Sequence, residues 1–238
     1  MMHRLPRIGI LGGMGPLATA DFLAKLTHAT AATRDQDHFP VTVESAPQIP
    51  DRVAALEGRG EDPLPALLAV AQRLGRAGCD LIAMPCNTAH LWHDALCAGT
   101  PLPVLHIADA VAGHLGGACR VGLMGTSATL RSGLYQRRIG NAHEWLLPTD
   151  DDMTRYVMPG VAAVKRNQMA EAAELLRLAA ISLARRGIDV LVLGCTEIPL
   201  ALRPGDASVP MIDATDALAR ATIAAATCLR DRNHGRAG

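Results

Sequence analysis

The sequence of 238 residues has no net charge, almost no lysine and little aromatic content. Phe, Trp and Tyr together make up 3% of the chain, and the only lysines are Lys25 and Lys165. Because 23 basic groups balance 23 acidic groups, no global positive field exists to collect nucleic acid or an anionic membrane surface. We therefore expect neither a nucleic-acid partner nor a membrane partner, whereas a local basic pocket remains compatible with this composition.

Two further patterns are missing. Nowhere do 18 apolar residues follow one another, so the sequence predicts no transmembrane helix, and the apolar stretch near the N-terminus is too short for a signal peptide. The six cysteines include no C-x-x-C pair for zinc or dithiol chemistry, and they are too sparse for a disulfide scaffold. These absences predict a reducing compartment and a cytoplasmic protein.

What is present is typical of an α/β protein. The apolar content of 49% excludes disorder, and short β-branched runs alternate with Ala- and Leu-rich stretches of helical periodicity. We predict helices at 64–76 and 169–186, ended by Gly78 and Gly187, and a last helix at 213–230. The segment 141–160 is predicted to be an excursion over the surface or over a site. Strands are predicted at 7–11, 41–45, 80–84, 103–106, 120–124, 189–193 and 209–212.

The chain also repeats itself. The segment RIGILGG at 7–13 matches RVGLMGT at 120–126, with an offset of 113, and GCDLIAMPCN at 78–87 matches GIDVLVLGCT at 187–196, with an offset of 109. Similar motifs in the same order at nearly the same offset predict two pseudo-symmetric α/β domains, each a mostly parallel sheet flanked by helices. The first half is predicted to cover 1–106 plus 213–238, and the second half 107–212. The active site is expected in the crevice between them.

The repeat places a cysteine after a buried strand in each half. Ligand sites of open parallel sheets lie beyond the carboxyl ends of the strands, which is where Cys86 and Cys195 are expected. Helix N-termini at these positions are expected to lower the thiol pKa toward neutrality. Two converging thiols suit the inversion of a carbon stereocentre, which needs one base on each face of the carbon. The other four cysteines, Cys79, Cys97, Cys119 and Cys228, are predicted to be core residues.

These motifs, together with IGILGGMGP at 8–16 and Pro50-Asp51-Arg52, resemble the aspartate/glutamate racemase family, and most of all its aspartate racemase branch. The resemblance extends from Ile8 to the C-terminal helix. It implies an isomerase that interconverts L- and D-aspartate without a cofactor or metal, commonly as a homodimer. It also implies that Cys86 and Cys195 are the catalytic proton donor and acceptor.

A dicarboxylic amino acid needs cationic or donor groups at both carboxylates. Arg52 is the first candidate, because a guanidinium can hold a carboxylate by two parallel bonds, and Lys165 is the second. Both resemble substrate-binding residues of the family. Glu197 could orient Thr196, contact the substrate amine or cap a helix. Backbone amides of 13–15 are suitable donors as well. The further expected substrate contacts are Met14, Asn87, Thr88, Ala89, Thr126, Ser127, Thr196 and Glu197.

Several alternatives remain open. The substrate could be glutamate or a broader range of amino acids, and the protein could be a non-catalytic amino-acid-binding protein on the same scaffold. Gly13-x-Gly15-x-x-Ala18 also satisfies a loose dinucleotide fingerprint, but no convincing acidic partner ends the second predicted strand. Cys86, His90 and His93 could face one side of a helix as metal ligands, but their spacing matches no common zinc pattern. We expect the two histidines to be surface or capping residues.

Overall fold

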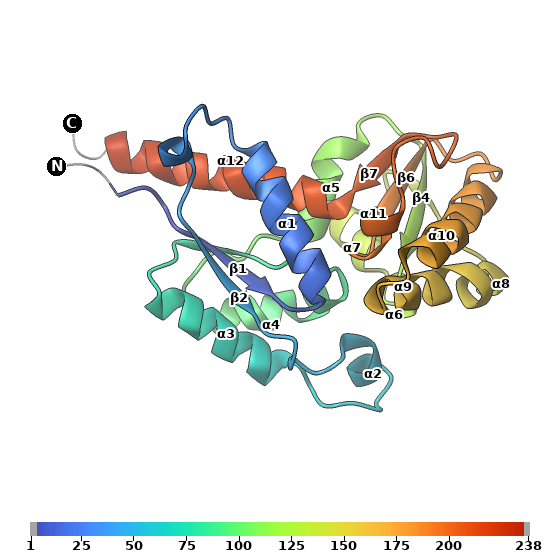
Figure 1. Ribbon diagram of the computed structural model, residues 1–238, viewed down its shortest axis with the longest axis horizontal. Coiled ribbons are helices and arrows are strands. Elements are labelled where there is room, and N and C mark those ends of the chain that lie inside the picture. Colours follow the sequence, from blue (N-terminus) through green and yellow to red (C-terminus); the bar gives the residue numbers. More distant parts are fainter. Residues whose placement is uncertain (1–3, 236–238) are drawn as a thin grey trace.

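The computed structural model describes residues 4–235, and the side chains of residues 4–232, as two parallel sheets flanked by helices (Figure 1). The first sheet has the strand order β2-β1-β3, with Ile8 of β1 opposite both Val41 and Leu81. The second has the order β5-β4-β6-β7 and is also parallel throughout. The strands are β1 (Ile8–Gly12), β2 (Val41–Ser45), β3 (Leu81–Ala83), β4 (Arg120–Gly125), β5 (Glu144–Leu146), β6 (Val190–Gly194) and β7 (Met211–Asp213).

Helices connect the strands and cover both sheets. In the first part of the chain these are α1 (Pro16–Ala29), the 3₁₀ turn η1 (Asp35–Asp37), α2 (Arg52–Leu56), α3 (Leu64–Arg76), the 3₁₀ turn η2 (Thr88–Trp92), α4 (His93–Ala98) and α5 (Ile107–Leu115). In the remainder they are α6 (Ser127–Arg131), α7 (Leu134–Ile139), α8 (Asp150–Asp152), the π-helical turn η3 (Met153–Val157), α9 (Met158–Lys165), α10 (Met169–Ala184), α11 (Ile198–Ala201) and α12 (Ala214–Gly235). Of the residues that the structure covers, none lies in a helix both long and apolar enough to cross a membrane.

The predicted fold class is confirmed, and most predicted elements lie within two residues of their expected positions. The helix predicted at 64–76 is α3, and Gly78 and Gly187 have the left-handed backbone conformation expected at a helix end, with φ of 77° and 75°. The strand predicted at 103–106 is reduced to a single parallel bridge between Ile82 and Val104. Carbonyl groups that would continue this strand lie instead beside histidine rings, as described below.

The segment 141–160 differs from its prediction. It contains β5, which pairs with β4, and then α8, η3 and the start of α9. Asp152 is buried, and its carboxylate accepts hydrogen bonds from the hydroxyl groups of Thr149 and Ser182, each at 2.9 Å. The three successive aspartates of α8, Asp150–Asp152, are therefore only partly exposed, because the third anchors α8 to α10.

The internal repeat is visible in the polar contacts as well as in the strands. Before β3, the Asp80 carboxylate accepts from the Arg7 amide at 2.6 Å, and before β6 the Asp189 carboxylate accepts from the Arg120 amide at 2.8 Å. In return, the amide of each aspartate donates to the carbonyl of the same arginine at 2.8 Å. The two halves thus begin their central strand pairs in the same way.

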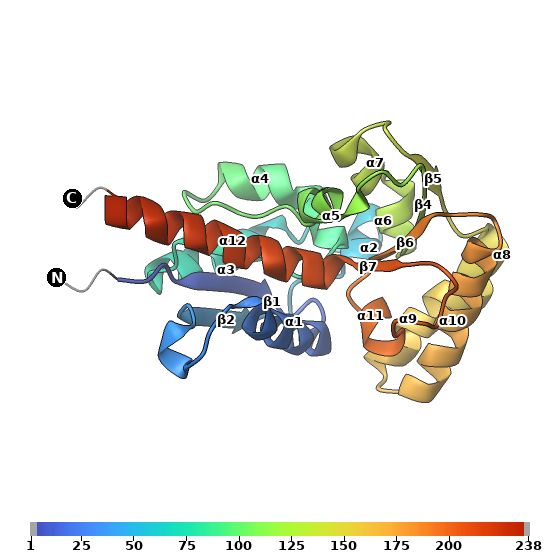
Figure 2. The same cartoon turned by 90° about the horizontal axis from the view of Figure 1, so that it is seen from above.

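The long helix α12 packs against α1 and α5, and the two views show it running lengthwise between the helices and strands of the first half (Figures 1 and 2). One apolar core combines Ile10 of β1, Leu123 of β4 and Leu218 of α12. In addition, the Lys25 ammonium on α1 pairs with the Asp213 carboxylate at the end of β7 at 2.6 Å. We therefore propose that the first half comprises 1–106 plus 213–238 and that the second half comprises 107–212.

Gly13, in the loop after β1, has a positive φ of 94° and lies close to the backbone of Ala46. A Cβ atom at this position would lie 2.4 Å from the backbone of Ala46. Gly58 also has a positive φ, of 69°, but a Cβ there would meet nothing within 4 Å, so Gly58→Ala is the matched control. We expect Gly58→Ala to lower the free energy of unfolding by about 1–2 kcal/mol from backbone strain alone. Gly13→Ala should cost about 1–3 kcal/mol more from the added collision.

Urea unfolding of both variants measures this difference. Equal losses of unfolding free energy would show that the approach of Ala46 to Gly13 imposes no constraint.

Candidate active site

Both repeated cysteines lie at the carboxyl edges of their sheets and reach one cavity. Cys86 follows β3 and Cys195 follows β6 directly, and their exposed fractions are only 5% and 4%. The cavity that they share measures about 30 Å³, which is room for one or two water molecules. Its lining comes from both sheets and comprises Met14, Asp51, Arg52, Val53, Cys86, Asn87, Thr88, Thr126, Lys165, Cys195, Thr196 and Glu197.

Ten of the twelve predicted site residues thus line this cavity, and two do not. Ala89 is fully buried in the core of the first half, and only its backbone N–H is directed to the site, as a donor to the Cys86 sulfur. Ser127 lines a separate groove beside Arg131 and Met153. Val53 was not expected from the sequence, and Asp51 was named there only as part of Pro50-Asp51-Arg52.

Burial dominates the ionisation of Cys86. The loss of solvent raises the pKa of this thiol, whereas the positive charge of Arg52 and the Ala89 N–H act in the opposite direction. The pKa of Cys195 is raised further, again first by burial and then by the negative charge of Glu197. The Cys195 thiol donates to the Glu197 carboxylate at 3.1 Å, and the Thr196 hydroxyl donates to the same oxygen at 3.1 Å.

The expectation that helix termini lower both thiol pKa values is therefore wrong in direction. Cys86 is followed by the short 3₁₀ turn η2 and Cys195 by the four-residue helix α11, so neither element supplies a substantial macrodipole. Desolvation of a charge in a closed cavity outweighs these small dipoles. Both thiols are therefore predominantly protonated at neutral pH.

Arg52 is the first residue of α2, which begins at the Asp51 cap. One terminal nitrogen of its guanidinium donates to the backbone carbonyls of Ile49 and Pro50, at 3.1 and 3.0 Å. Its Nε atom is buried and has no hydrogen-bond partner. The side chain is thus held by the loop before α2 and lies beside the Cys86 thiol, whose pKa its positive charge lowers.

Lys165, at the end of α9, lines both the thiol cavity and a larger outer chamber next to it. The chamber measures about 650 Å³ and shares four charged residues with the thiol cavity, namely Asp51, Arg52, Lys165 and Glu197. The rest of its lining is mostly apolar, from the loop after β1, the start of α1, the loop before α2, and α9 and α11: Gly13, Gly15, Pro16, Leu17, Ala18, Pro47, Ile49, Val164, Asn167 and Leu200. A molecule entering from solvent would pass the charged side chains before it reached the cysteines.

The loop after β1 is less available to a ligand than expected. The amide of Gly13 donates to the Thr19 hydroxyl at 2.8 Å, and this hydroxyl in turn donates to the Gly15 carbonyl at 2.9 Å. The Gly13 amide is therefore used within the loop and does not face the site as a free donor. Met14, which is buried, remains in the cavity lining.

Polar side chains join the two halves next to Cys86. The hydroxyl oxygens of Thr88, Thr126 and Thr129 lie 3.0 Å from one another in a closed triangle. Asn87 also takes a partner from the second half, since its Oδ1 atom accepts from the Tyr135 hydroxyl at 2.5 Å. Its Nδ2 atom is buried without a partner. Thr129 and Tyr135 were missed by the sequence analysis, because no local pattern connects them to the cysteine motifs.

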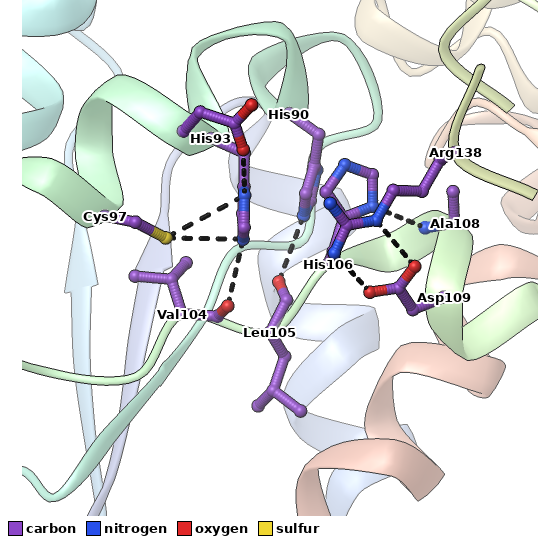
Figure 3. Close-up of polar contacts among 10 residues, drawn as sticks. His90, His93, Cys97, Val104, Leu105, His106, Ala108, Asp109 and Arg138 are labelled. Atoms are coloured by element: carbon purple, nitrogen blue, oxygen red, sulfur yellow. Dashed lines mark hydrogen bonds and ion pairs between the residues drawn. The ribbon is translucent and has the colours of Figure 1, made fainter.

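The histidines after Cys86 are buried, which corrects the expectation of surface residues. The rings of His90, His93 and His106 cluster beside α4, with centroids 4.7–6.0 Å apart (Figure 3). The Nδ1 atom of His90 lies 2.9 Å from the Cys86 carbonyl and its Nε2 atom 3.3 Å from the Leu105 carbonyl. His93 Nε2 lies 3.0 Å from the carbonyl oxygen of Val104.

Two of these rings, His90 and His93, thus lie against the carbonyl groups of Leu105 and Val104. The segment that holds these carbonyls forms only a single bridge with β3. In the described part of the chain, no three His, Cys, Asp or Glu side chains are arranged to hold a metal ion.

The remaining cysteines are also less uniform than predicted. Cys79 is a core residue, whereas Cys97, Cys119 and Cys228 are exposed. The two cysteines that recur in the repeat are therefore distinguished from the other four by the cavity that they share rather than by burial alone.

Comparisons with known proteins find relatives over most of the chain. The model of the Asp/Glu/Hydantoin racemase family matches residues 11–222. A broad specificity amino-acid racemase of Bacillus subtilis, RacX, is 27% identical to this chain. The match covers 91% of this chain and 96% of the length of RacX. The structure of an aspartate racemase from Picrophilus torridus superposes with a TM-score of 0.83 and 35% identity, covering 93% of this chain and 94% of the other. A glutamate racemase of Ralstonia nicotianae is 31% identical over 67% of this chain and 60% of its own.

The histidine cluster generates a prediction for stability. Burial lowers the pKa of His90 to about 3 and that of His106 to about 4, so both are neutral in the folded protein at neutral pH. In the unfolded chain a histidine pKa is about 6.5, so below that pH the unfolded state binds more protons. The contribution of these two histidines to the free energy of unfolding should therefore be complete above about pH 6.5. It should decrease as the pH falls from about 6.5 toward about 4.

His90→Gln should make this decrease smaller, because one of the titrating groups is removed. The exposed His28→Gln is the control and should leave the pH dependence unchanged. Urea unfolding at a series of pH values measures the dependence, and the same slope in His90→Gln as in the wild type would contradict the assignment.

Proposed function

The chain belongs to the Asp/Glu/Hydantoin racemase family, and from this premise we propose that it interconverts L- and D-aspartate by moving the α-proton between Cys86 and Cys195, without a cofactor. The observation that carries the proposal is that the two repeated cysteines, one from each half, line the same buried cavity. A carbon held between them would have one sulfur on each face. Binding alone does not require two thiols, which disfavours a non-catalytic amino-acid-binding protein.

Unsatisfied donors support a carboxylate ligand. Arg52 Nε and Asn87 Nδ2 are both buried without a partner, and both residues line the cavity. A buried donor without a partner costs about 1–3 kcal/mol, and a substrate carboxylate would satisfy both donors. When the α-proton leaves, charge develops on this carboxylate, and fixed donors stabilise such charge by about 3 kcal/mol each. We assign these two groups to the α-carboxylate and the enediolate formed from it.

The two thiols have different surroundings, which favours different starting states. Arg52 and the Ala89 N–H favour a thiolate at Cys86, whereas Glu197 accepts a hydrogen bond from the Cys195 thiol and its negative charge disfavours ionisation of that thiol. In one direction, the Cys86 thiolate takes the α-proton, and the Cys195 thiol then delivers its own proton to the opposite face. In the reverse direction the roles exchange, and Glu197 is the group within reach that can receive the Cys195 proton.

Two cationic side chains at the cavity suit a substrate with two carboxylates. With Arg52 assigned to the α-carboxylate, Lys165 is left for the carboxylate of the side chain, at the junction with the outer chamber. The similarity to an aspartate racemase supports this assignment. The apolar lining of the outer chamber, with Leu17, Ile49 and Leu200, favours a broader substrate range as the second candidate. Such a range is the activity named for the Bacillus relative.

Location and assembly remain predictions from the sequence. We propose a homodimer, as the family resemblance implies, and a reducing, cytoplasmic location, as the sparse cysteines predict. Light scattering of the purified protein tests the oligomeric state.

The first functional prediction concerns exchange at the α-carbon. Wild-type protein incubated with L-aspartate in deuterated water should produce α-deuterated D-aspartate, measured by chiral chromatography and mass spectrometry. Cys86→Ala and Cys195→Ala should each reduce racemisation by at least about a hundredfold, because each removes an acid or base from one face. Cys228→Ala, at an exposed cysteine on α12, is the matched control and should retain the wild-type rate.

A panel of amino acids that includes glutamate separates the aspartate proposal from the broader range. No exchange with any member of the panel would refute the racemase proposal. A wild-type rate in either single variant of the paired cysteines would refute the two-base scheme.

The second functional prediction concerns pH. Because the pKa values of both thiols are raised, few molecules carry a thiolate at neutral pH, and kcat/KM should rise by up to about tenfold per pH unit from about pH 7 to about pH 9. Glu197→Gln removes a negative charge that raises the pKa of Cys195, so it should move the rise to lower pH. A flat profile over this range in the wild type would contradict the protonated resting state.

A further inference from the structure

We propose that Tyr135, which does not line the cavity, is a positioning residue for both cysteine motifs. Its hydroxyl fixes the side-chain amide of Asn87 next to Cys86, and its ring packs against Gly194 next to Cys195. This inference rests on the proposed racemase function and adds a residue from outside the two motifs to it. The side chain is fully buried and belongs to α7, an element that the function has not so far involved.

The hydroxyl determines which end of the Asn87 amide is left without a partner. Burial, followed by the negative charge of Asp213, raises the pKa of Tyr135 far above its usual range, so the phenol stays protonated and donates. It donates to Asn87 Oδ1 at 2.5 Å, and the other end of the amide, Nδ2, is left buried without a partner. The N–H groups of Nδ2 are therefore the part of the amide that still lacks a partner and can donate to a ligand.

The equivalent residue of the second motif is held differently. Thr196 follows Cys195 as Asn87 follows Cys86, but its hydroxyl donates to Glu197 within its own motif. Asn87 receives its hydrogen bond from Tyr135, which is 48 positions further along the chain and in the other half. The orientation of Asn87 therefore depends on the packing of α7.

The ring of Tyr135 also limits the backbone at the second cysteine. A Cβ atom on Gly194 would lie 3.3 Å from Cε2 of Tyr135 and 2.7 Å from Cδ1 of Leu123. The backbone just before Cys195 thus runs close against the ring. One rigid side chain therefore touches the chain next to each of the two cysteines, so it can maintain their relative placement.

Loss of the hydroxyl should act on the reaction through Asn87. Without it, the Asn87 amide can rotate and present its oxygen to the substrate carboxylate, which replaces an attraction by a repulsion. We expect Tyr135→Phe to reduce kcat/KM by about 10- to 100-fold, the effect of losing one hydrogen bond to a charged group. Because Phe keeps the ring, the contact with Gly194 is retained.

A double-mutant cycle tests this route. If Tyr135 acts through Asn87, then Tyr135→Phe should cause no further loss of kcat/KM in the Asn87→Ala background. The sequence offers a matched control, because Tyr156 is its only other tyrosine, and Tyr156→Phe should leave kcat/KM unchanged. Additive losses in the double variant, or a wild-type kcat/KM in Tyr135→Phe, would overturn the proposal.

A spectroscopic measurement tests the same contact without altering the hydroxyl. Labelling the Tyr156→Phe protein with 3-fluorotyrosine places a single fluorine probe at Tyr135. Saturating L-aspartate should shift its ¹⁹F resonance, because ligand binding at Asn87 Nδ2 polarises the amide that accepts the phenol proton. In the Asn87→Ala background the shift should be lost. An unchanged resonance in the first protein, or an unchanged shift in the second, would contradict the coupling.

Failure of this inference is distinguishable from failure of the proposed function. If L-aspartate is not exchanged, the same measurements use the amino acid of the panel that the wild type exchanges fastest. Absence of exchange with the whole panel refutes the racemase function itself, whatever Tyr135 does. Normal wild-type exchange together with an unaffected Tyr135→Phe variant refutes only the positioning role.

Discussion

The site depends on one packing arrangement, in which α12 and α5 bury apolar surface against both sheets at once. The core that contains Ile10 of β1 and Leu123 of β4 also contains Leu218 of α12, so neither half can move without exposing part of it. Within each sheet all strands are parallel, so their carboxyl ends share one edge. When the shared core fixes the two halves, these edges face each other and a cysteine arrives from each.

The same burial sets the chemistry of the cavity. Removing solvent raises the pKa of both thiols, which is unfavourable for a base, but it strengthens every charge interaction within the cavity. Arg52 and the Ala89 N–H oppose the shift at Cys86, and Glu197 increases it at Cys195. Two motifs that are nearly equivalent in the sequence thereby become inequivalent in their electrostatics.

Polar contacts between the halves give the apolar core a defined geometry. Hydrophobic packing is not directional, whereas the triangle of Thr88, Thr126 and Thr129 and the bond from Tyr135 to Asn87 require particular distances. Each of these groups is buried, so a shift of one half relative to the other would leave donors without partners. The residues that position the site are consequently found on both sides of the junction.

The sequence by itself determined the features that depend on neighbouring residues. Apolar periodicity predicted α3 and the main strands, the glycines predicted the helix ends at Gly78 and Gly187, and the repeat identified Cys86 and Cys195 as a pair. Only the tertiary structure decided the direction of the thiol pKa shifts, the burial of His90 and the contact from Tyr135 to Asn87. Burial and contacts between distant positions leave no local pattern, because they arise only when the two halves pack together.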